Sequence, residues 1–358
     1  MEKVLLAMSG GTDSSVAAIL LKNQNYNIHG MTFRAYDSDL NACMEKETGC
    51  CNVDSIFQAK KLAEELGFKH EIFDIRDYFE KTVIQNFIDE YLNAKTPNPC
   101  VICNQLIKWQ KMIEQADKLN CRYFATGHYA QIAYENNRYY IREGVDKTKD
   151  QSYFLWSLSQ ENLARTIFPL GELTKKEVRN IAKKNNYDKI ADKKESQEIC
   201  FIPNDNYRDF LKSRIKNIDE IIGEGNIRDS SGKIIGKHKG YPFYTIGQRK
   251  GLNVAMGFPV YVCAIDKTKN EIILGEKNEL NKKEIWVDNI NLMKYETIDK
   301  EIRATCKIRY NNKGENCKIK QKDNKIHVIF DNSVSAVTPG QSAVFYENAD
   351  LIGGGIII

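Results

Sequence analysis

A strand, a glycine-rich turn and a helix open this chain, and their order limits the folds that can follow. The apolar run Val4–Leu6 is typical of a buried strand, and Val16–Leu21 is typical of a helix. Between them lies Ala7-Met8-Ser9-Gly10-Gly11-Thr12-Asp13-Ser14-Ser15. Such a turn aims backbone N–H groups and a helix N-terminus at one point, which suits an anion. Its two glycines let a phosphate approach the backbone closely, because no Cβ is in the way.

The side chains of the turn support the same interpretation. Its serine and threonine hydroxyls are hydrogen-bond donors, and Asp13 either holds a magnesium ion or caps the helix. No Gly-Lys-Ser/Thr follows, so this is not a Walker motif. The string Ser-Gly-Gly-x-Asp-Ser-Ser resembles the PP-loop of ATP pyrophosphatases. The resemblance implies that ATP is cut between its α and β phosphates and that AMP is transferred to an oxygen. The alternative is an ordinary glycine turn before a helix.

The first half of the chain alternates between strand-like and helix-like segments. Strand-like runs occur at Val4–Ala7, Ile28–Phe33, His70–Ile75 and Tyr123–Thr126. Helical periodicity fills the intervals, at Ser14–Lys22, Asp54–Leu66, Tyr78–Leu92 and Gln105–Leu119. The alternation predicts an α/β domain with a doubly wound, Rossmann-like parallel sheet. The glycine-rich turn then lies at the carboxyl edge of the sheet, where such folds bind ligands.

The rest of the chain is richer in short β elements. Alternating runs predict hairpins over residues 131–142 and 260–274, and Thr174–Glu177 is a capping box that opens a helix. Short strands about ten residues apart in the last part predict a small β-barrel or sandwich. We therefore expect an α/β domain over residues 1–203, a small central connector domain over 204–277 and a C-terminal β-barrel over 278–358.

The composition is that of an ordinary globular protein, with 42% hydrophobic and 28% charged residues. No apolar run approaches the roughly 20 residues of a membrane span. Because the chain enters a strand at once, we expect no signal peptide and a cytoplasmic location. Its ten cysteines are then thiols, metal ligands or catalysts rather than structural bridges. A net charge of +4 permits a nucleic-acid partner without requiring one. With no evident oligomerisation segment, we expect a monomer.

Three cysteines stand out for their surroundings. Cys100 and Cys103 form a Cys-x-x-Cys pair after two prolines, which indicates a redox dithiol, half of a metal site or chance. The prolines stop the preceding helix, so we expect Cys103 at or near the start of the next one. A helix N-terminus lowers a thiol pKa and favours the reactive thiolate. Cys200 lies in a mixed polar and apolar segment, and its alternative role is that of a small buried residue.

Together these segments resemble the bacterial tRNA-specific 2-thiouridylases. Beyond the PP-loop-like turn, the resemblance rests on blocks that occur in order along the whole chain: Asn98-Pro99-x-x-x-Cys103-Asn104, Ala125–Tyr129, Lys149–Tyr153, Ser196–Ile202, Gly247–Gly251 and Thr338–Ser342. The family implies ATP and Mg²⁺ as cofactors and the anticodon stem-loop of tRNA as a partner. It also implies a cysteine desulfurase or a sulfur-relay protein as the sulfur donor. The wobble uridine is adenylated on its C2 oxygen, and sulfur then displaces AMP.

Site residues carry over by position. Cys200 would hold a persulfide, and Cys103 would release its sulfur by forming a disulfide with Cys200 or attack as the partner thiol. The implied ATP contacts are Ala7, Met8, Ser9, Gly10, Gly11, Thr12, Asp13, Ser14, Phe33 and Gly127. The implied tRNA contacts are Asn98, Pro99, Cys100, His128, Lys149, Asp150, Gln151, Arg309, Tyr310 and Gln341. Without the resemblance, the Arg309-Tyr310 pair would be an ordinary exposed strand pair.

One position departs from the family pattern. Many relatives carry Asp where this chain has Cys100, and that Asp is a candidate acid–base group. The substitution raises an alternative in which Cys100, Cys103 and Cys200 bind a 4Fe–4S cluster with an open iron, as in some related tRNA thiolases. Cys43, Cys50 and Cys51 form either a sulfur-accepting or a non-functional loop. Cys121, Cys263, Cys306 and Cys317 are expected in packing roles. A PP-loop ligase that forms AMP is the competing class of enzyme.

Overall fold

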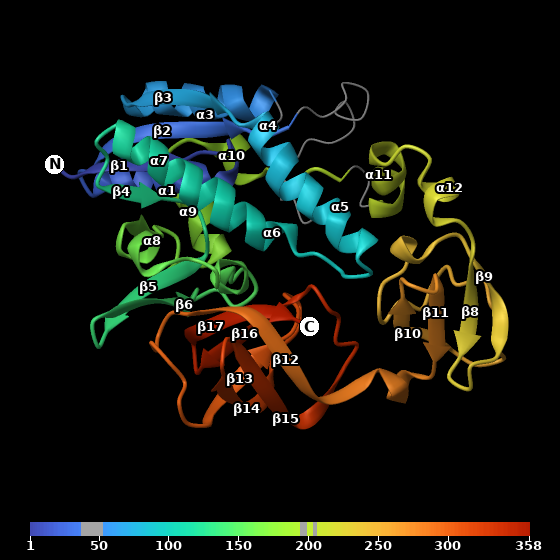
Figure 1. Cartoon of the computed structure of the whole chain (residues 1–358). Coiled ribbons are helices and arrows are strands. Elements are labelled where there is room, and N and C mark those ends of the chain that lie inside the picture. Colours follow the sequence, from blue (N-terminus) through green and yellow to red (C-terminus); the bar gives the residue numbers. More distant parts are fainter. Residues whose placement is uncertain (37–52, 194–198, 203–205) are drawn as a thin grey trace.

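A parallel sheet forms the N-terminal part of the molecule (Figure 1). The computed structural model describes residues 1–36, 53–193, 199–202 and 206–358. All neighbouring strands pair in parallel, in the order β3 (Lys69–Asp74), β2 (Asn27–Arg34), β1 (Lys3–Ala7), β4 (Tyr123–Ala125) and β7 (Thr166–Ile167). This order confirms the expected α/β domain. The two-residue β7 is too short to give a recognisable sequence pattern.

Helices cover both faces of the sheet. Val4 and Leu6 of β1 pack with residues of α1 (Thr12–Asn23) and α3 (Val53–Leu66). Leu5 points to the other face, where it packs with residues of α7 (Met112–Lys118). A strand that is buried on both faces needs a continuous apolar run rather than an alternating one, which explains the sequence of β1.

Two long helical stretches follow β3, and both contain π-helical turns. The first runs through α4 (Arg76–Phe79), the π-helical Glu80–Ile84 and α5 (Gln85–Leu92). The second runs through α6 (Pro99–Ile102), the π-helical Cys103–Lys111 and α7. The second stretch begins at Pro99 and not near Cys103, because proline is favoured in the first turn of a helix. Cys100 therefore occupies the helix N-terminus, and Cys103 opens the π-helical turn.

The chain then leaves the sheet and returns to it. It forms the expected hairpin β5 (Ala130–Glu135) and β6 (Arg138–Glu143), α8 (Gln160–Ala164) and β7. The predicted capping box opens α9 (Lys175–Lys184), which α10 (Asp188–Ala191) follows. β6 also pairs with the last strand of the chain at Arg142 and Asp350. The hairpin thus joins the N-terminal part to the C-terminal barrel, a contact that periodicity does not reveal.

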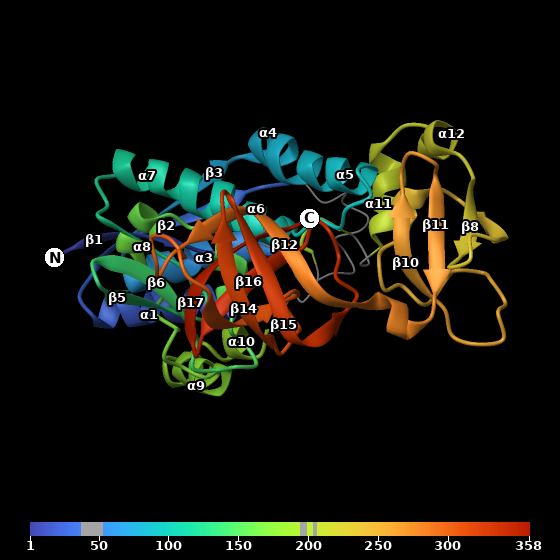
Figure 2. The same cartoon turned by 60° about the horizontal axis from the view of Figure 1, so that its bottom comes forward.

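The central module lies to one side of the rest of the molecule (Figures 1 and 2). It begins with α11 (Tyr207–Arg214) and α12 (Ile218–Ile222). Its strands pair in the order β10 (Tyr261–Asp266), β11 (Glu271–Gly275), β8 (Gly225–Asp229) and β9 (Ile234–His238). The β10–β11 hairpin is the one that the sequence predicts.

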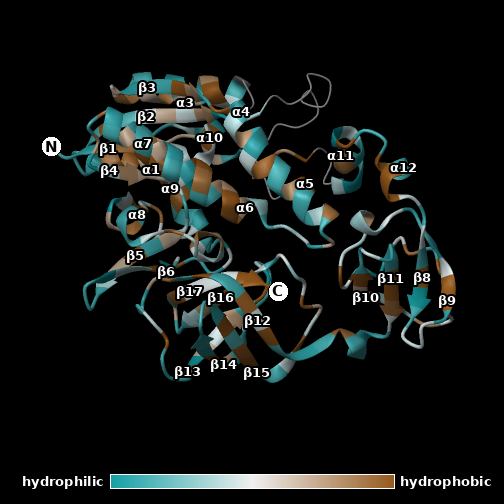
Figure 3. Ribbon diagram, in the orientation of Figure 1, coloured by the Kyte–Doolittle hydropathy of each residue, from teal (hydrophilic) through white to brown (hydrophobic). Residues whose placement is uncertain are grey.

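The C-terminal strands close into an antiparallel barrel. The strands follow one another in the order β12 (Asn281–Leu292), β15 (Lys325–Ser335), β14 (Glu315–Lys322), β13 (Ile302–Lys307), β16 (Ser342–Glu347) and β17 (Asp350–Ile357). The additional pairing of β12 with β17 closes the ring, which selects the barrel over the sandwich. Hydrophobic and hydrophilic residues alternate along β13–β15 (Figure 3), because one face of each strand lines the core.

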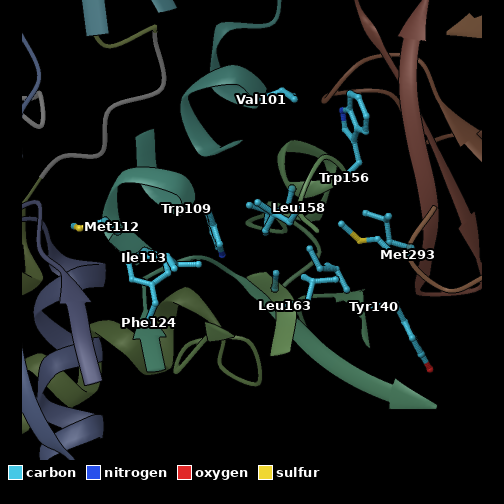
Figure 4. Packing of buried hydrophobic residues seen from close by; sticks show 14 of the residues in the cluster. Val101, Trp109, Met112, Ile113, Phe124, Tyr140, Trp156, Leu158, Leu163 and Met293 are labelled. Atoms are coloured by element: carbon cyan, nitrogen blue, oxygen red, sulfur yellow. The ribbon is translucent and has the colours of Figure 1, made fainter. Parts of the chain in front are cut away.

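One hydrophobic cluster contains residues of both the barrel and the α/β part, which pack against each other there (Figure 4). Trp109 and Phe124 of the α/β part belong to this cluster together with Met293 and Tyr346 of the C-terminal part. The Trp156 indole adds a hydrogen bond to Ser342 Oγ at 2.9 Å. A shared core of this kind fixes the relative orientation of the two parts. In the part of the chain that the structure describes, no helix is long and apolar enough to cross a membrane.

Candidate active site

The hydroxyl groups of the glycine-rich turn between β1 and α1 form hydrogen bonds within the turn. The Ser9 and Ser14 hydroxyls lie 3.2 Å apart, and Ser14 Oγ also accepts from Ser9 N at 3.2 Å. Gly10 has a φ of +68°, and a Cβ there would lie 2.0 Å from the Ser55 carbonyl oxygen. Only glycine fits this position. Ala7 ends β1, and the buried Met8 continues its pairing by donating its N–H to the Met31 carbonyl.

Asp13 has partners that the sequence does not indicate. Gly11 is the N-cap of α1, and no side chain caps this helix, so the capping role considered for Asp13 is not observed. Instead, Asp13 Oδ1 accepts from Lys175 Nζ at 2.7 Å and from the Tyr129 hydroxyl at 2.8 Å. Thr12 is turned away from the loop, and its hydroxyl donates to the Ile190 carbonyl at 2.6 Å. The carboxylate of Asp13 is therefore positioned at the first turn of α1.

Gly127 follows β4 and lies against the start of α1. A Cβ at Gly127 would come within 2.9 Å of the Asp13 carbonyl carbon and the Ser14 nitrogen. Glycine is therefore required for backbone packing beside the turn. On the opposite side, Phe33 near the end of β2 is half-buried, with its ring centroid 5.8 Å from that of Phe73. It offers an apolar surface at the carboxyl edge of the sheet.

Two of the cysteines singled out by the sequence, Cys103 and Cys200, lie at one aromatic cluster. Cys103 is half-buried and packs against the cluster that contains Phe79, Phe87 and Phe201. Cys200 is exposed and directly precedes Phe201, and its carbonyl accepts a hydrogen bond from the Tyr36 hydroxyl. The T-shaped contacts of Phe201 with Phe79 and Phe87 anchor this segment. The second helical stretch and the Cys200 segment, about a hundred residues apart in sequence, thus share one core.

The three cysteines do not form the ligand set that the cluster alternative requires. Cys100 is exposed at the first turn of α6, while Cys103 faces the aromatic core. Within the described ranges, which include all three, no three His, Cys, Asp or Glu side chains converge as metal ligands. This arrangement does not fit a 4Fe–4S cluster, which needs thiolates that converge on one centre.

Two of the residues expected to contact RNA, His128 and Asp150, are buried. The His128 imidazole is 7% exposed, and its Nδ1 lies 2.7 Å from Thr126 Oγ1. Burial, reinforced by the Lys108 ammonium, holds the pKa of His128 well below its usual range. Asp150 is also buried and accepts from the backbone of Gly144 and from the Ser152 hydroxyl. Both side chains have geometry suited to positioning their neighbours.

Gln151 connects this buried group to the turn. Its side-chain Oε1 accepts from the Tyr129 backbone N–H at 3.1 Å, and its backbone N–H donates to the Tyr129 carbonyl at 2.9 Å. Because the Tyr129 hydroxyl reaches Asp13, one residue links the Lys149–Gln151 segment to the glycine-rich turn. Lys149 is half-buried, and its N–H donates to the Asp146 carbonyl at 3.0 Å.

The remaining expected RNA contacts meet where the barrel touches the α/β part. Gln341 Nε2 donates to the carbonyls of Thr96 and Pro97 at 3.0 and 2.9 Å, next to Asn98 and Pro99. Arg309 is half-buried and donates to the Ala336 carbonyl. Tyr310 is 39% exposed, with its ring centroid 4.5 Å from that of Phe154.

Comparison with known proteins addresses the family as a whole. The sequence matches the tRNA methyl transferase HUP domain over residues 2–204, the tRNA methyl transferase PRC-barrel domain over 208–276 and the aminomethyltransferase beta-barrel domain over 282–357. It is 48% identical over 356 residues to the tRNA-specific 2-thiouridylase MnmA of Cytophaga hutchinsonii, covering 99% of this chain and 97% of that protein. The proteins of the same name from Amoebophilus asiaticus and Salinibacter ruber are 48% and 47% identical. Each alignment covers 99% of this chain, with 95% and 94% of the two relatives.

The chain belongs to the tRNA-specific 2-thiouridylase family. The resemblance seen in the motifs is thus confirmed at full length. Among solved structures, one titled as a predicted subunit of tRNA methyltransferase from Methanocaldococcus jannaschii is 21% identical. It has a TM-score of 0.32 and covers 51% of this chain and 76% of that one. The fold is assigned from the strand order of this chain and not from this likeness.

Membership of the 2-thiouridylase family leaves most individual residue assignments as predictions. Cys121, Cys306 and Cys317 are buried and Cys263 is half-buried, as expected for packing. Cys43, Cys50 and Cys51 lie outside the described residues. Lys175 and Tyr129 are beside the turn but were missed, because helix and strand patterns do not reveal which distant segments meet it. Lys175 belongs to a lysine-rich stretch that is usually a solvated surface.

Proposed function

We propose that this chain is a tRNA-uridine 2-sulfurtransferase, an enzyme that converts the wobble uridine of tRNA to 2-thiouridine with release of AMP and pyrophosphate. The observation that carries the proposal is its similarity over nearly its whole length to curated tRNA-specific 2-thiouridylases. The anion-binding geometry of the glycine-rich turn supports it, because a triphosphate must be held there for AMP transfer.

The first step uses ATP. The C2 oxygen of the uridine attacks the α phosphorus, the bond to the β phosphate breaks, and pyrophosphate leaves with the electron pair. The backbone N–H groups of residues 7–14 and the hydroxyls of Ser9 and Ser14 hold the phosphates, and Phe33 and Gly127 border the nucleoside. Asp13 would hold Mg²⁺, which binds proteins through one or two carboxylates and takes its other ligands from phosphates and water. The adenylated oxygen is then a good leaving group.

The second step transfers sulfur. The terminal sulfur of a persulfide on Cys200 attacks C2, and AMP leaves with the C2 oxygen. The Cys103 thiolate then attacks Cys200 Sγ, the S–S bond to the transferred sulfur breaks, and 2-thiouridine is released. The transferred sulfur is reduced while the two cysteines are oxidised to a disulfide, so an external thiol must reduce this disulfide before the next cycle. The shared aromatic core of the two segments supports this pairing.

The remaining assignments concern partners and organisation. We infer that tRNA contacts the segments of Asn98–Cys100, Lys149–Gln151, Arg309–Tyr310 and Gln341, with His128 behind them. Exposed Tyr310 offers a ring for stacking an unpaired base. A cysteine desulfurase or a sulfur-relay protein supplies the persulfide. The protein acts as a cytoplasmic monomer, with domains over residues 1–203, 204–277 and 278–358.

The deciding experiment measures the products from ATP. Anaerobically purified protein is incubated with ATP and Mg²⁺, with and without unmodified tRNA, after its absorbance near 400 nm is recorded. We expect AMP and pyrophosphate to appear only with tRNA, and no absorbance shoulder. Products that do not depend on tRNA, or ADP as the product, contradict the proposal and favour a PP-loop ligase. A 400 nm shoulder contradicts the persulfide route and favours a cluster.

A further inference from the structure

The glycine-rich turn contains no cation of its own. Residues 7–15 include no lysine or arginine, although the bound triphosphate would carry several negative charges. In Walker-type loops a lysine within the motif reaches the phosphates. Backbone N–H groups and hydroxyls alone leave much of this charge uncompensated, and a single Mg²⁺ neutralises only part of it. Any further positive charge must come from elsewhere in the fold.

Lys175 brings one ammonium group to the helix side of the turn. Its side chain is 10% exposed, and its Nζ lies 2.7 Å from Asp13 Oδ1. Lys175 is the first residue of α9, where the helix dipole disfavours a cation. Its backbone N–H is fixed by a hydrogen bond to Asp146 Oδ2 at 2.9 Å. A buried lysine at a position that helix electrostatics disfavour indicates a function for its charge.

Lys193 brings a second ammonium group to the turn, at Gly10. Its Nζ donates to the Gly10 carbonyl at 3.1 Å, to Ser55 Oγ at 3.1 Å and to Gln58 Oε1 at 3.0 Å. Lys193 follows α10, whose Ile190 carbonyl accepts from the Thr12 hydroxyl. Two contacts therefore tie this segment to the turn. One ammonium group is bonded to Gly10 within the loop, and the other is bonded to Asp13 in the first turn of α1.

We propose that Lys175 and Lys193 are the cationic ligands of the nucleotide polyphosphate and replace the lysine that the loop lacks. The inference rests on the proposed function, since it assigns additional ligands within the same nucleotide site. In the free protein, Asp13 and the Gly10 carbonyl hold the two ammonium groups near the turn. Asp13 would hold Mg²⁺ when the nucleotide is bound, and the two ammonium groups then turn to phosphate oxygens. Both lysines thereby favour the departure of pyrophosphate, on which negative charge develops.

Glutamine substitutions separate the charge from the packing. Lys175→Gln and Lys193→Gln keep a long side chain and an N–H donor for Asp13 or Gly10 but remove the positive charge. The exposed neighbours Lys176 and Lys189 provide matched controls, as Lys176→Gln and Lys189→Gln. Full-length proteins are titrated by calorimetry with ATP, inorganic pyrophosphate and adenosine, in the presence of Mg²⁺ and without tRNA.

We expect a loss of affinity only for the ligands that carry phosphates. Lys175→Gln and Lys193→Gln should each weaken ATP and pyrophosphate binding by about 10- to 100-fold, which is the typical effect of a charge-assisted hydrogen bond. Adenosine affinity should stay within about two-fold, because adenosine carries no charge for the lysines to contact. Each variant should also show a weaker dependence of pyrophosphate affinity on KCl concentration than the wild type. The two controls should match the wild type in all titrations.

Three other outcomes would contradict either the role of the lysines or the proposed function. If the glutamine variants bind pyrophosphate as tightly as the wild type, the lysines are not phosphate ligands. Equal losses for adenosine and pyrophosphate also overturn the proposal, because the effect would then not lie at the phosphates. If the wild type itself binds neither ATP nor pyrophosphate, the proposed function fails rather than the assignment of the lysines.

Discussion

At the scale of single residues, Cys103 and Cys200 are expected to act only in the sulfur half of the reaction. Each change to serine should abolish 2-thiouridine formation, measured by mass spectrometry of digested tRNA. Neither thiol borders the glycine-rich turn in the contacts described above, so the ATP dissociation constant should stay within about two-fold, as for other surface changes away from a site. Cys263→Ser in the central module is the control. Retained thiolation in Cys200→Ser would exclude the persulfide role.

Gly127 gives a second residue-scale prediction, which tests backbone packing at the turn. In Gly127→Ala the new Cβ would lie 2.9 Å from backbone atoms of Asp13 and Ser14, so β4 and α1 must separate. We expect ATP affinity to fall at least about ten-fold, since a small displacement of positioning groups has a large effect. Affinity for tRNA, measured by filter binding, should change much less. Equal losses of both affinities would instead indicate a general disturbance of the fold.

Which site residues can be predicted depends on how far apart in the sequence they are. The turn, the Cys-x-x-Cys pair and the Gly127 position lie in recognisable local patterns. Lys175 and Lys193 reach the turn from 162 and 183 residues downstream of the atoms they contact. Helical periodicity places such lysines on a surface and does not indicate which other element they meet. The burial of His128 could not be predicted either, because the motif does not indicate which of its side chains are exposed.

At the scale of elements, the turn before β16 packs closely against the segment that leads to Cys100. Gly340 has a φ of +90°, and a Cβ there would come within 2.9 Å of the Lys95 Cβ and the Thr96 carbonyl oxygen. Gly340→Ala should lower the free energy of unfolding by about 1–3 kcal/mol through strain and overlap. It should also reduce thiolation more than ATP binding, because it displaces the start of α6.

Gly232→Ala is the matched control for this change. Gly232 also has a positive φ, of +86°, but nothing lies within 4 Å of its Cβ position. It therefore carries the cost of the backbone conformation without the overlap. Urea denaturation and a thiolation assay on both variants separate the effect of the backbone conformation from the effect of the overlap. If Gly232→Ala reduces thiolation as much as Gly340→Ala does, the contact with the segment before α6 is not the cause.

Element boundaries were predictable where side chains alternate and not where packing decides them. The apolar run at the end of the sequence marks only the last residues of β17, which begins at Asp350, runs through Gly353–Gly355 and ends at Ile357. Glycines weaken a strand pattern, yet a Cβ at Gly353 would lie 2.3 Å from the Asn291 carbonyl oxygen. Closure of the barrel therefore requires glycine in this strand. The start of the helix at Pro99 has a local cause, because proline is favoured in the first turn of a helix.

At the scale of the whole molecule, the family assignment and the fold agree, and the barrel and the α/β part share one core. Stability should also depend on pH, because folding withdraws imidazoles of the α/β part and of the central module from water. Burial lowers the pKa of His29, His128 and His238 and brings that of His70 to about 4. An unfolded chain binds protons at these groups below about pH 6.5, whereas the folded protein does not.

The sign of the effect follows from this difference. Between about pH 6.5 and 4 the unfolded state holds more protons, so stability is lost as the pH falls through that window. Carboxylates with lowered pKa values lose their contribution only at lower pH, so urea denaturation at pH 7.5 and 5.5 reports mainly the histidines. His70 alone should account for about 1 kcal/mol of the difference in the free energy of unfolding between these two pH values. His70→Gln, which can keep the 2.8 Å contact with Thr32 Oγ1, should reduce the difference by that amount. An unchanged difference would show that His70 titrates alike in both states.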